Sequence, residues 1–541
     1  MNRKYYSIAF AILLASNVNA QDLKTEISVS HEIIPEERSA TRLRILPSIT
    51  LPTINPGRLA SASSFYPSAI TPSFNILEPA DYLLNVKRSP FKGYAELNYG
   101  PIYNLNASAG YRFFEKSNFC FDGYMQFNGM SYDSRYTKFE HIYSDKVNIH
   151  RNTALIGGNT YWRPKGVNGE LTAAVMYQFS AYNFPILMIP QPVVNSVDIF
   201  ANQVKVDARW SARIGNVDYA ISGNYNMIAF AKDKASNGGK LNGSVKWKYS
   251  DISTWALDLG ASVVNSTIVG YKGIVNVKPK YIFSNSHVST SVGVNFDLKT
   301  GNCAATRNFV IAPDIQVNWK PLSLLSVWAN INGKMLYNNR VDLYNEQAYL
   351  LPEFDAGFSR LYIADAGVTF GPWHGLSAGL YGGYVVGKDW YMPGIITGEM
   401  DPINIQGAHG GVSLTYDYKR FLSINVKADL AQSPDGNFNY GYAFWRDHAM
   451  FNLMAQVKIR PIKPLEIGVC YHLRTNRSKV LVVNYLDLQN INNLSAKASY
   501  AINSQWSAFV NIDNILNQKW YLGPSMPSQG IVAMLGGSFK F

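Results

Sequence analysis

Charged residues are scarce in this chain of 541 residues. They make up 16% of the sequence, against about 25% in typical soluble proteins. After residues 1–20 no long unbroken apolar run occurs, and a helix that crosses a bilayer needs about 20 apolar residues. If the chain enters a membrane, it must therefore do so as a closed β-barrel, because only helices and closed barrels satisfy their backbone groups in lipid.

Cysteine and catalytic motifs are also lacking. The three cysteines, Cys120, Cys303 and Cys470, are odd in number and far apart, so they form neither a disulfide framework nor a metal site. The sequence has no phosphate-binding loop, no nucleophile-elbow glycine pattern and no nucleic-acid-binding motif. The eight histidines are scattered, and the net charge of +12 is spread along the chain. We therefore expect no enzymatic activity, no cofactor or metal, and no nucleic-acid partner.

The first twenty residues have the pattern of an export signal. Arg3 and Lys4 give a positive start, Ile8 to Ala15 is apolar, and Val18-Asn19-Ala20 offers a small-residue cleavage site. This pattern is typical of a signal peptide over residues 1–20. The apolar run is too short to serve as a membrane anchor.

Residues 21–90 are rich in proline and serine and show little alternation of apolar and polar positions. Such composition favours irregular structure. We expect a periplasmic or lumen-directed segment without a compact core. Seven of its eight prolines are Pro47, Pro52, Pro56, Pro67, Pro72, Pro79 and Pro90.

From residue 91 to 541 apolar and polar residues alternate in segments of about ten residues, which is typical of transmembrane barrel strands. In one segment Leu422, Ile424 and Val426 alternate with Asn425 and Lys427. Counting such segments predicts an all-β fold, a transmembrane antiparallel β-barrel of about 22 strands, with about 16–20 as the alternative.

The connections between these segments alternate between short and long. Outer-membrane barrels have tight periplasmic turns and extended external loops, whereas a soluble β-sandwich has no reason to sort loops by parity. The short connections include Gly215-Asn216, Asp251-Ile252, Lys320-Pro321, Pro461 to Pro464 and Asn503-Ser504. The long ones, expected to be extracellular, are 130–147, 182–197, 338–355, 387–403, 431–447 and 516–528.

Alternation also predicts which side chains face the lumen. Leu422, Val457 and Ile467 should face lipid, while the polar positions between such residues face inward. The inward set would form a basic stripe on the lumen wall, able to attract anions. The alternative is that Asp429 and Glu466 neutralise it. The stripe consists of Lys427, Lys458, Arg460, His472 and Arg474.

The end of the chain resembles a known family. Asn511 to Tyr521 is similar to the penultimate-strand motif of TonB-dependent receptors, and Gly536 to Phe541 is similar to their last strand. The segments Gly93 to Gly100 and Ala107 to Tyr111 resemble receptor-like barrels from Bacteroidetes. The resemblance implies an outer-membrane receptor barrel, and it implies that Phe539 and Phe541 form the signal read by the barrel-assembly machinery.

The chain departs from that family before the barrel. Receptors of this family carry a large globular plug domain, whereas residues 21–90 are too few and too rich in proline to form one. We therefore expect a receptor-like barrel without a plug in the cell outer membrane, surrounded by lipid, for solute passage or for docking a periplasmic or surface partner protein. The alternatives are a passive porin-like channel and a structural or assembly barrel that anchors surface proteins.

Overall fold

The computed structural model describes most of residues 91–541, and the signal-peptide and 21–90 predictions lie outside the described residues. Within 91–541 the residues left undescribed are 135–146, 188–193, 231–233, 268–269, 302–308, 338–357, 394–399, 433–448, 478, 481–485, 488–489 and 524–525.

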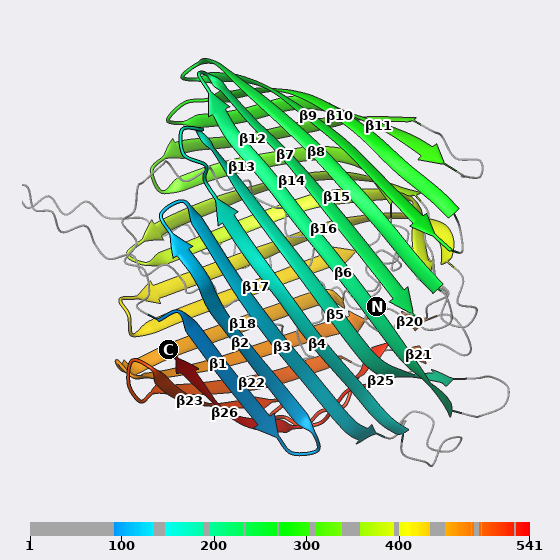
Figure 1. The fold of residues 1–541 in the computed structure, drawn as a ribbon, viewed down its shortest axis with the longest axis vertical. Helices are drawn as coiled ribbons and strands as arrows, with labels where there is room; N and C mark the ends of the chain where they lie inside the picture. Colours follow the sequence, from blue (N-terminus) through cyan, green and yellow to red (C-terminus); the bar gives the residue numbers. More distant parts are fainter. Residues whose placement is uncertain are drawn as a thin grey trace, which may run out of the picture. The chain divides into compact units, whose positions relative to one another are not determined.

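The described residues form one antiparallel sheet of 22 strands that closes on itself (Figure 1). Two short hairpins, β20–β21 and β24–β25, lie outside this sheet. None of the described residues belongs to a helix long and apolar enough to cross a membrane. The strands are β1 (Gly93–Gly100), β2 (Asn104–Lys116), β3 (Phe119–Ser134), β4 (Val147–Trp162), β5 (Gly169–Leu187), β6 (Val194–Ile214), β7 (Val217–Phe230), β8 (Lys234–Ser250), β9 (Ser253–Ser266), β10 (Gly270–Ser284), β11 (Val288–Gly301), β12 (Phe309–Leu322), β13 (Leu325–Tyr337), β14 (Phe358–Trp373), β15 (Leu376–Pro393), β16 (Met400–Tyr418), β17 (Leu422–Gln432), β18 (Ala449–Ile462), β19 (Leu465–Arg477), β20 (Lys479–Val480), β21 (Leu486–Asp487), β22 (Ile491–Ala501), β23 (Trp506–Asp513), β24 (Tyr521–Gly523), β25 (Met526–Pro527) and β26 (Val532–Lys540).

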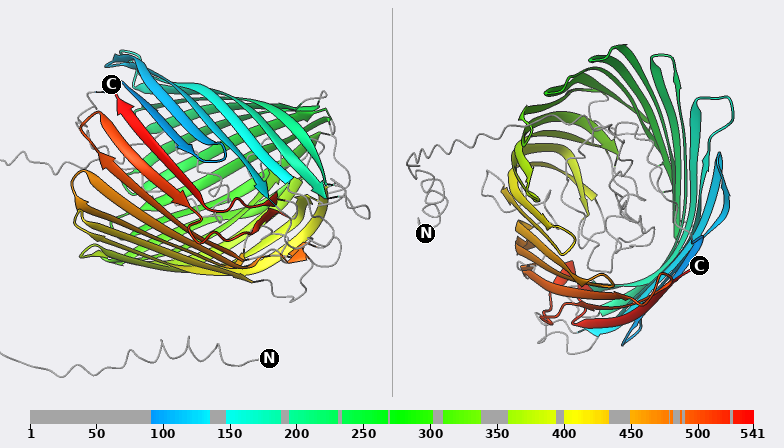
Figure 2. Two further views of the ribbon diagram at one scale, coloured as in Figure 1. Left: turned by 90° about the horizontal axis from the view of Figure 1, so that it is seen from below. Right: turned by 90° about the vertical axis from the view of Figure 1, so that its left-hand side faces the viewer.

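Closure is made by the first and last strands. β1 pairs with β26 from Tyr94 opposite Lys540 to Tyr99 opposite Leu535. Beyond the ladder, the backbone N–H of Gly93 donates to the carbonyl oxygen of Phe541 at 2.8 Å, and the N–H of Phe541 donates back at 3.0 Å. The two ribbons lie side by side in the end-on and lateral views (Figure 2). The prediction of a barrel of about 22 strands is confirmed, and the alternative of fewer strands is wrong.

Short and long connections alternate as predicted, with two differences. The turn expected at Lys320-Pro321 lies further along, at residues 323–324, because β12 continues through an irregularity between Trp319 and Leu322. A bulge accommodates a proline that cannot join the ladder. At the opposite end of the barrel three connections are short rather than long, at residues 101–103, 231–233 and 267–269.

The strands are also longer than the alternation indicates. β5 has 19 residues and β6 has 21, and they occupy most of the segment 182–197 expected to be a loop. The two strands of a hairpin can continue their backbone hydrogen bonds beyond the apolar band that contacts lipid, since strand pairing does not require lipid on one face. Alternation marks only the part of each strand whose two faces differ in polarity, so it underestimates strand length.

Candidate functional site

The wall of the barrel has one polar face and one apolar face, and the strand register keeps them separate around the ring. Glu96 of β1 lies opposite Ser108 of β2 on one side and Ser538 of β26 on the other. Residues paired across successive strands all lie on one face of the sheet. The face on which β1 begins is therefore the face on which β26 meets β1 again, because no register shift exchanges the two faces. The exposed large apolar side chains lie almost entirely on the opposite face. They include Leu97, Ile156, Leu241, Ile311, Leu380 and Leu535.

The register places the predicted basic residues together on the polar face of β17–β19. Lys427 lies opposite Met454, which lies opposite His472. In the adjacent row Asn452 is opposite Arg474, and two rows away in the other direction Ser423 is opposite Lys458. The residues predicted to face lipid occupy the other face, where Leu422 pairs with Ile459 and Ile459 with Ile467.

Carboxylates accompany two of these cations. Lys427 Nζ lies 3.4 Å from Asp429 Oδ2, and Arg460 contacts Glu466 at 2.7 Å. These are the acidic groups that the alternative interpretation named. Arg474, with 5% of its surface exposed, donates to His472 at 3.1 Å. No carboxylate lies within ion-pair distance of Lys458 among the described residues. The region is therefore a mixed network of charges with a basic excess.

Lys497 adds a cation to this region that was not predicted from the sequence. Lys497 of β22 lies opposite Gly468, which in turn lies opposite Lys458. The ammonium group of Lys497 sits 5.1 Å from the centre of the Phe509 ring. Its alternation within the segment marks it as inward, but only the cross-strand register places it in the row of Lys458.

A polar cluster on β14–β17 was also not predicted from the sequence. His409 Nε2 of β16 lies 2.8 Å from Asp365 Oδ1 of β14, and the hydroxyl of Tyr381 on β15 donates to Asp429 of β17. Only 6% of the Asp365 side-chain surface is exposed. Alternation assigns each residue to a face but gives no information about which distant carboxylate meets which histidine.

Two glycines make room for these carboxylates. A Cβ atom at Gly383 would lie 1.9 Å from Asp365 Oδ1, and one at Gly411 would lie 2.7 Å from Asp429 Oδ1. Both distances are shorter than real Cβ contacts. The paired glycines 382–383 and 410–411 are the signal in the sequence that this part of the wall is crowded.

Elsewhere around the ring, other carboxylates and cations also form ion pairs. Lys280 of β10 bridges two carboxylates, at 3.5 Å to Asp258 and 2.8 Å to Asp314. On β2 and β3, Arg112 donates to Asp122 at 2.9 Å. The polar face thus holds ion pairs on well-separated strands, which keeps its charges satisfied in a partly buried setting.

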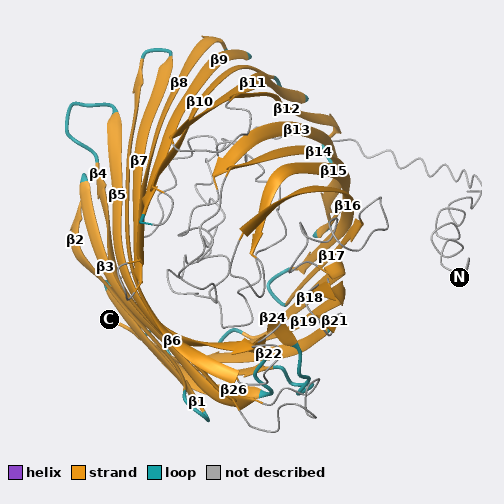
Figure 3. Cartoon of the chain, turned by 90° about the vertical axis from the view of Figure 1, so that its right-hand side faces the viewer, coloured by secondary structure: helices purple, strands orange, loops and turns teal. Residues whose placement is uncertain are grey.

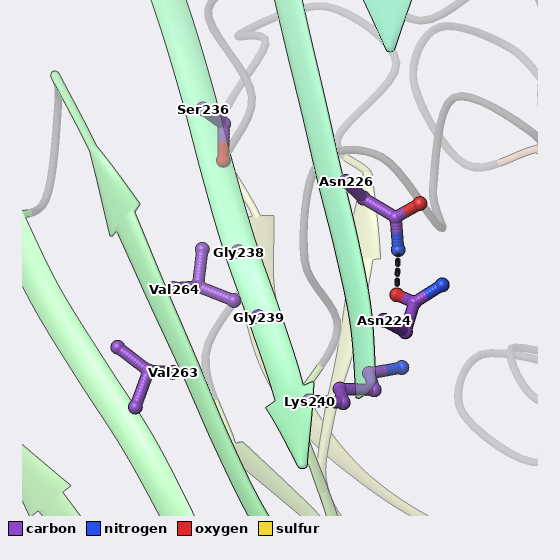
Figure 4. A pocket seen from close by; sticks show the side chains of 8 residues that line it. All are labelled: Asn224, Asn226, Ser236, Gly238, Gly239, Lys240, Val263 and Val264. Carbon is purple, nitrogen blue, oxygen red and sulfur yellow. Dashed lines mark hydrogen bonds between the residues drawn. The ribbon is translucent and has the colours of Figure 1, made fainter. Parts of the chain in front are cut away.

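A small depression lies on β7–β9 and is lined by four polar residues, two glycines and two valines (Figure 4). In it the amide of Asn226 donates to Asn224, beside Lys240 and Ser236. The space suits roughly one water molecule. Among the residues described, no three histidine, cysteine or acidic side chains gather as a metal site would need.

The residues predicted to form the assembly signal lie in an aromatic cluster on the apolar face. The rings of Trp506 and Phe539 stack at 4.4 Å between centroids. Phe541 stacks on Phe539 at 5.6 Å and on Tyr111 of β2 at 6.0 Å. The cluster therefore spans the seam where the barrel closes.

The segment Asn511 to Tyr521, which resembles the receptor motif, comprises the end of β23, a tight loop and the first residue of β24. Asn514, with 1% exposure, holds it through its side chain, donating to the carbonyl oxygens of Gln518 at 2.7 Å and Gln529 at 3.1 Å. The side chain of Asn517 accepts from the N–H of Ile531 at 3.0 Å. Asn514 and Asn517 have positive φ angles of 50° and 49°, a conformation that asparagine tolerates. Trp520, at the end of this loop, is buried, with 4% of its surface exposed.

Comparison with known proteins shows the fold. No family model matches the sequence, and no curated protein matches it. Solved structures do match, at low sequence identity. The FrpB iron transporter from Neisseria meningitidis aligns with a TM-score of 0.63 and 10% identity over 83% of this chain and 81% of that one.

Two further receptors align in the same way. The siderophore receptor PirA from Acinetobacter baumannii gives a TM-score of 0.64 and 9% identity, covering 83% of this chain and 80% of that one. The ferripyoverdine receptor of the outer membrane of Pseudomonas aeruginosa gives 0.59 and 12%, covering 83% and 72%. At such identity the likeness shows the fold. The chain has a closed 22-stranded barrel like that of these receptors, so the predicted fold is confirmed.

Proposed function

We propose that the protein is a receptor- or transport-class barrel of the outer membrane, related to TonB-dependent receptors, through which a solute passes or in which a partner protein docks. The observation that carries the proposal is the closed ring of 22 strands with one face lined by ion pairs. A structural barrel needs no such lining, whereas a route for polar solutes does.

In this proposal the polar face lines the lumen and the apolar face contacts lipid. The distribution of exposed apolar side chains supports the assignment, because Leu97, Leu380 and Leu535 are 56%, 61% and 66% exposed. Aliphatic groups exposed to this degree are stable against hydrocarbon. Charged groups in the same positions would be costly in lipid.

The basic region of β17–β22 would then lie on the lumen wall. Lys458 and Lys497 share a row there, and Arg474 lies on the same face three rows away. Low-dielectric walls focus the field of such charges and raise the local concentration of anions. We therefore propose that anionic or anion-bearing solutes are favoured over cationic ones.

The remaining parts of the chain receive roles from the sequence. Residues 1–20 would direct export, and residues 21–90 would occupy the periplasm or the lumen in place of a plug domain. A periplasmic or surface partner protein would complete the barrel if residues 21–90 do not fill it. Phe539 and Phe541 would be read by the barrel-assembly machinery, and lipid would surround the barrel.

Conductance of the purified protein in planar bilayers tests this function. The matched pair is the mature protein and a variant without residues 21–90. We expect discrete channels in the shortened variant, with smaller or fewer openings in the mature protein. Equal large openings in both would favour the passive porin-like channel. Absence of conductance in both would remove solute passage and leave partner docking or a structural role.

A further inference from the structure

The wall of the barrel is interrupted between β12 and β13. These strands pair only from Asp314 opposite Asn332 to Leu322 opposite Leu325. On its other side β12 pairs with β11 as far as Phe309, and β13 pairs with β14 as far as Tyr337. Residues 309–313 and 333–337 are thus strand residues with one paired neighbour each among the described strands.

Beyond this break the ends of β13 and β14 lie on the polar face of β10–β12. A Cβ atom at Gly333 would lie 2.4 Å from the Cβ of Ala312. Ala312 shares its face of β12 with Asp314, whose carboxylate contacts Lys280 on that same face. Figure 3 shows the ends of β13 and β14 turned toward the interior of the ring. We call residues 333–337 and 358–362 the inner strand ends.

Two side chains of β11 replace the backbone partner that β13 loses. Asn295 donates to the carbonyl oxygen of Gly333 at 2.8 Å, and Asp297 accepts from the N–H of Met335 at 2.7 Å. Both side chains are buried, with exposures of 0% and 1%. Buried backbone groups need a partner, so these contacts are what permits β13 to leave β12.

Apolar packing completes the docked arrangement. Met335 and Phe358 of the inner strand ends are buried in one cluster with Ile274, Val310 and Ala312 of the wall. Two lysines of the polar face cover the aromatic rings, Lys272 over Tyr337 at 5.6 Å and Lys299 over Phe358 at 5.0 Å. A cation and the aromatic ring that it covers attract each other most strongly where water is excluded from the contact.

The sequence of β13 fits the wall equally well. Ile331, Gly333, Met335 and Tyr337 continue the apolar alternation without a break, as a lipid-facing strand requires. Extending the register from Asp314 opposite Asn332 would bring Lys334 opposite Ala312. In that arrangement Lys334, not Gly333, would share the polar face with Ala312.

We propose that the inner strand ends are a gate with two positions. In the docked position they narrow the lumen, held by Asn295, Asp297 and the apolar cluster. In the wall position they re-pair with residues 309–313 of β12 and widen it. This inference rests on the proposed passage of a solute through the lumen, and it names how that passage is regulated.

Disulfide trapping distinguishes the two positions, in a background where Cys120, Cys303 and Cys470 are serine. The pair Ala312→Cys with Gly333→Cys tests the docked position, where the two Cβ atoms would lie 2.4 Å apart and need to separate by only about 1 Å to reach the roughly 3.5–4.5 Å of a disulfide. The pair Ala312→Cys with Lys334→Cys tests the wall position, where the two residues lie opposite each other. We expect the first pair to form on mild oxidation and the second to form slowly. Failure of either pair to form, measured by mass spectrometry of the folded protein, overturns the gate.

Conductance of the same proteins gives the functional readout. Oxidation of the 312–333 pair should lower it, and reduction should restore it. Gly333→Leu should raise conductance, because the new side chain would collide with Ala312 in the docked position and force the inner strand ends out of it, whereas Gly243→Leu, where a new side chain meets open space, should not. Trapped disulfides with unchanged conductance would overturn gating. If no form conducts, solute passage fails, while the trapping pattern still decides whether two positions exist.

Discussion

The carboxylate of Asp297 on β11 accepts a hydrogen bond from the backbone N–H of Met335 on β13, two strands away in the sheet. The intervening strand β12 would ordinarily supply that acceptor. A side chain has taken the place of a backbone partner, which is how a strand leaves the wall without an orphaned polar group.

Removing this acceptor should destabilise the barrel. We predict that Asp297→Ala lowers the free energy of unfolding by about 1–3 kcal/mol, because the buried N–H of Met335 loses its partner. Reversible urea unfolding in lipid vesicles, followed by tryptophan fluorescence, measures the change. Asp251→Ala, in the exposed turn between β8 and β9, is the control and should change stability little. Equal stability of the two variants would contradict this role of Asp297.

Adjacent glycines of β15 should differ sharply in their tolerance of a methyl group. Gly383→Ala would place a Cβ against Asp365 and the carbonyl oxygen of Ala364, while at Gly382 the nearest atom is 3.6 Å away. We predict a loss of about 1–3 kcal/mol at 383, typical of overpacking, and little change at 382. The same unfolding assay decides the matter, and a larger loss at 382 would show that the assigned faces of β15 are reversed.

Charge selectivity should depend on Lys458 more than on the ion pair of Arg460 with Glu466. Arg460 contacts Glu466 at 2.7 Å, so replacing it exposes a carboxylate as well as removing a cation. We predict that Lys458→Gln weakens anion preference and that Arg460→Gln together with Glu466→Gln leaves it nearly unchanged, since that double change conserves net charge. The measurement is the reversal potential under a salt gradient. A cation preference in the unaltered protein would refute the basic-region proposal.

The side of the membrane reached by each set of connections is also open to test. The parity of the strands predicts that a peptide tag inserted after Asn339 is extracellular and that one in the turn Pro461 to Pro464 is periplasmic. Antibody binding to intact cells should detect the first tag alone. Detection of the second tag instead would mean that the orientation is inverted.

The sequence allowed the strand count and the face of each side chain to be predicted, because alternation is a local property. It did not allow the interruption at Asp314 to be predicted, since alternation in β13 continues through Gly333 and Met335 in either arrangement. Contacts such as Asp365 with His409 join residues far apart in the chain, and they depend on cross-strand register. Gly383 and Gly411 were visible in the sequence, but the carboxylates that they accommodate were not.

The central claim is that the polar face lines the lumen and the apolar face meets lipid. Val457 and Gln456 are neighbours on β18 and occupy opposite faces, opposite Ile424 and Asn425 of β17. An arginine facing lipid near the midplane costs about 2–4 kcal/mol, whereas a lumen site tolerates it. We predict that Val457→Arg is less stable than Gln456→Arg by that amount in vesicle unfolding experiments. Equal stabilities, or a greater loss at Gln456, would contradict the account.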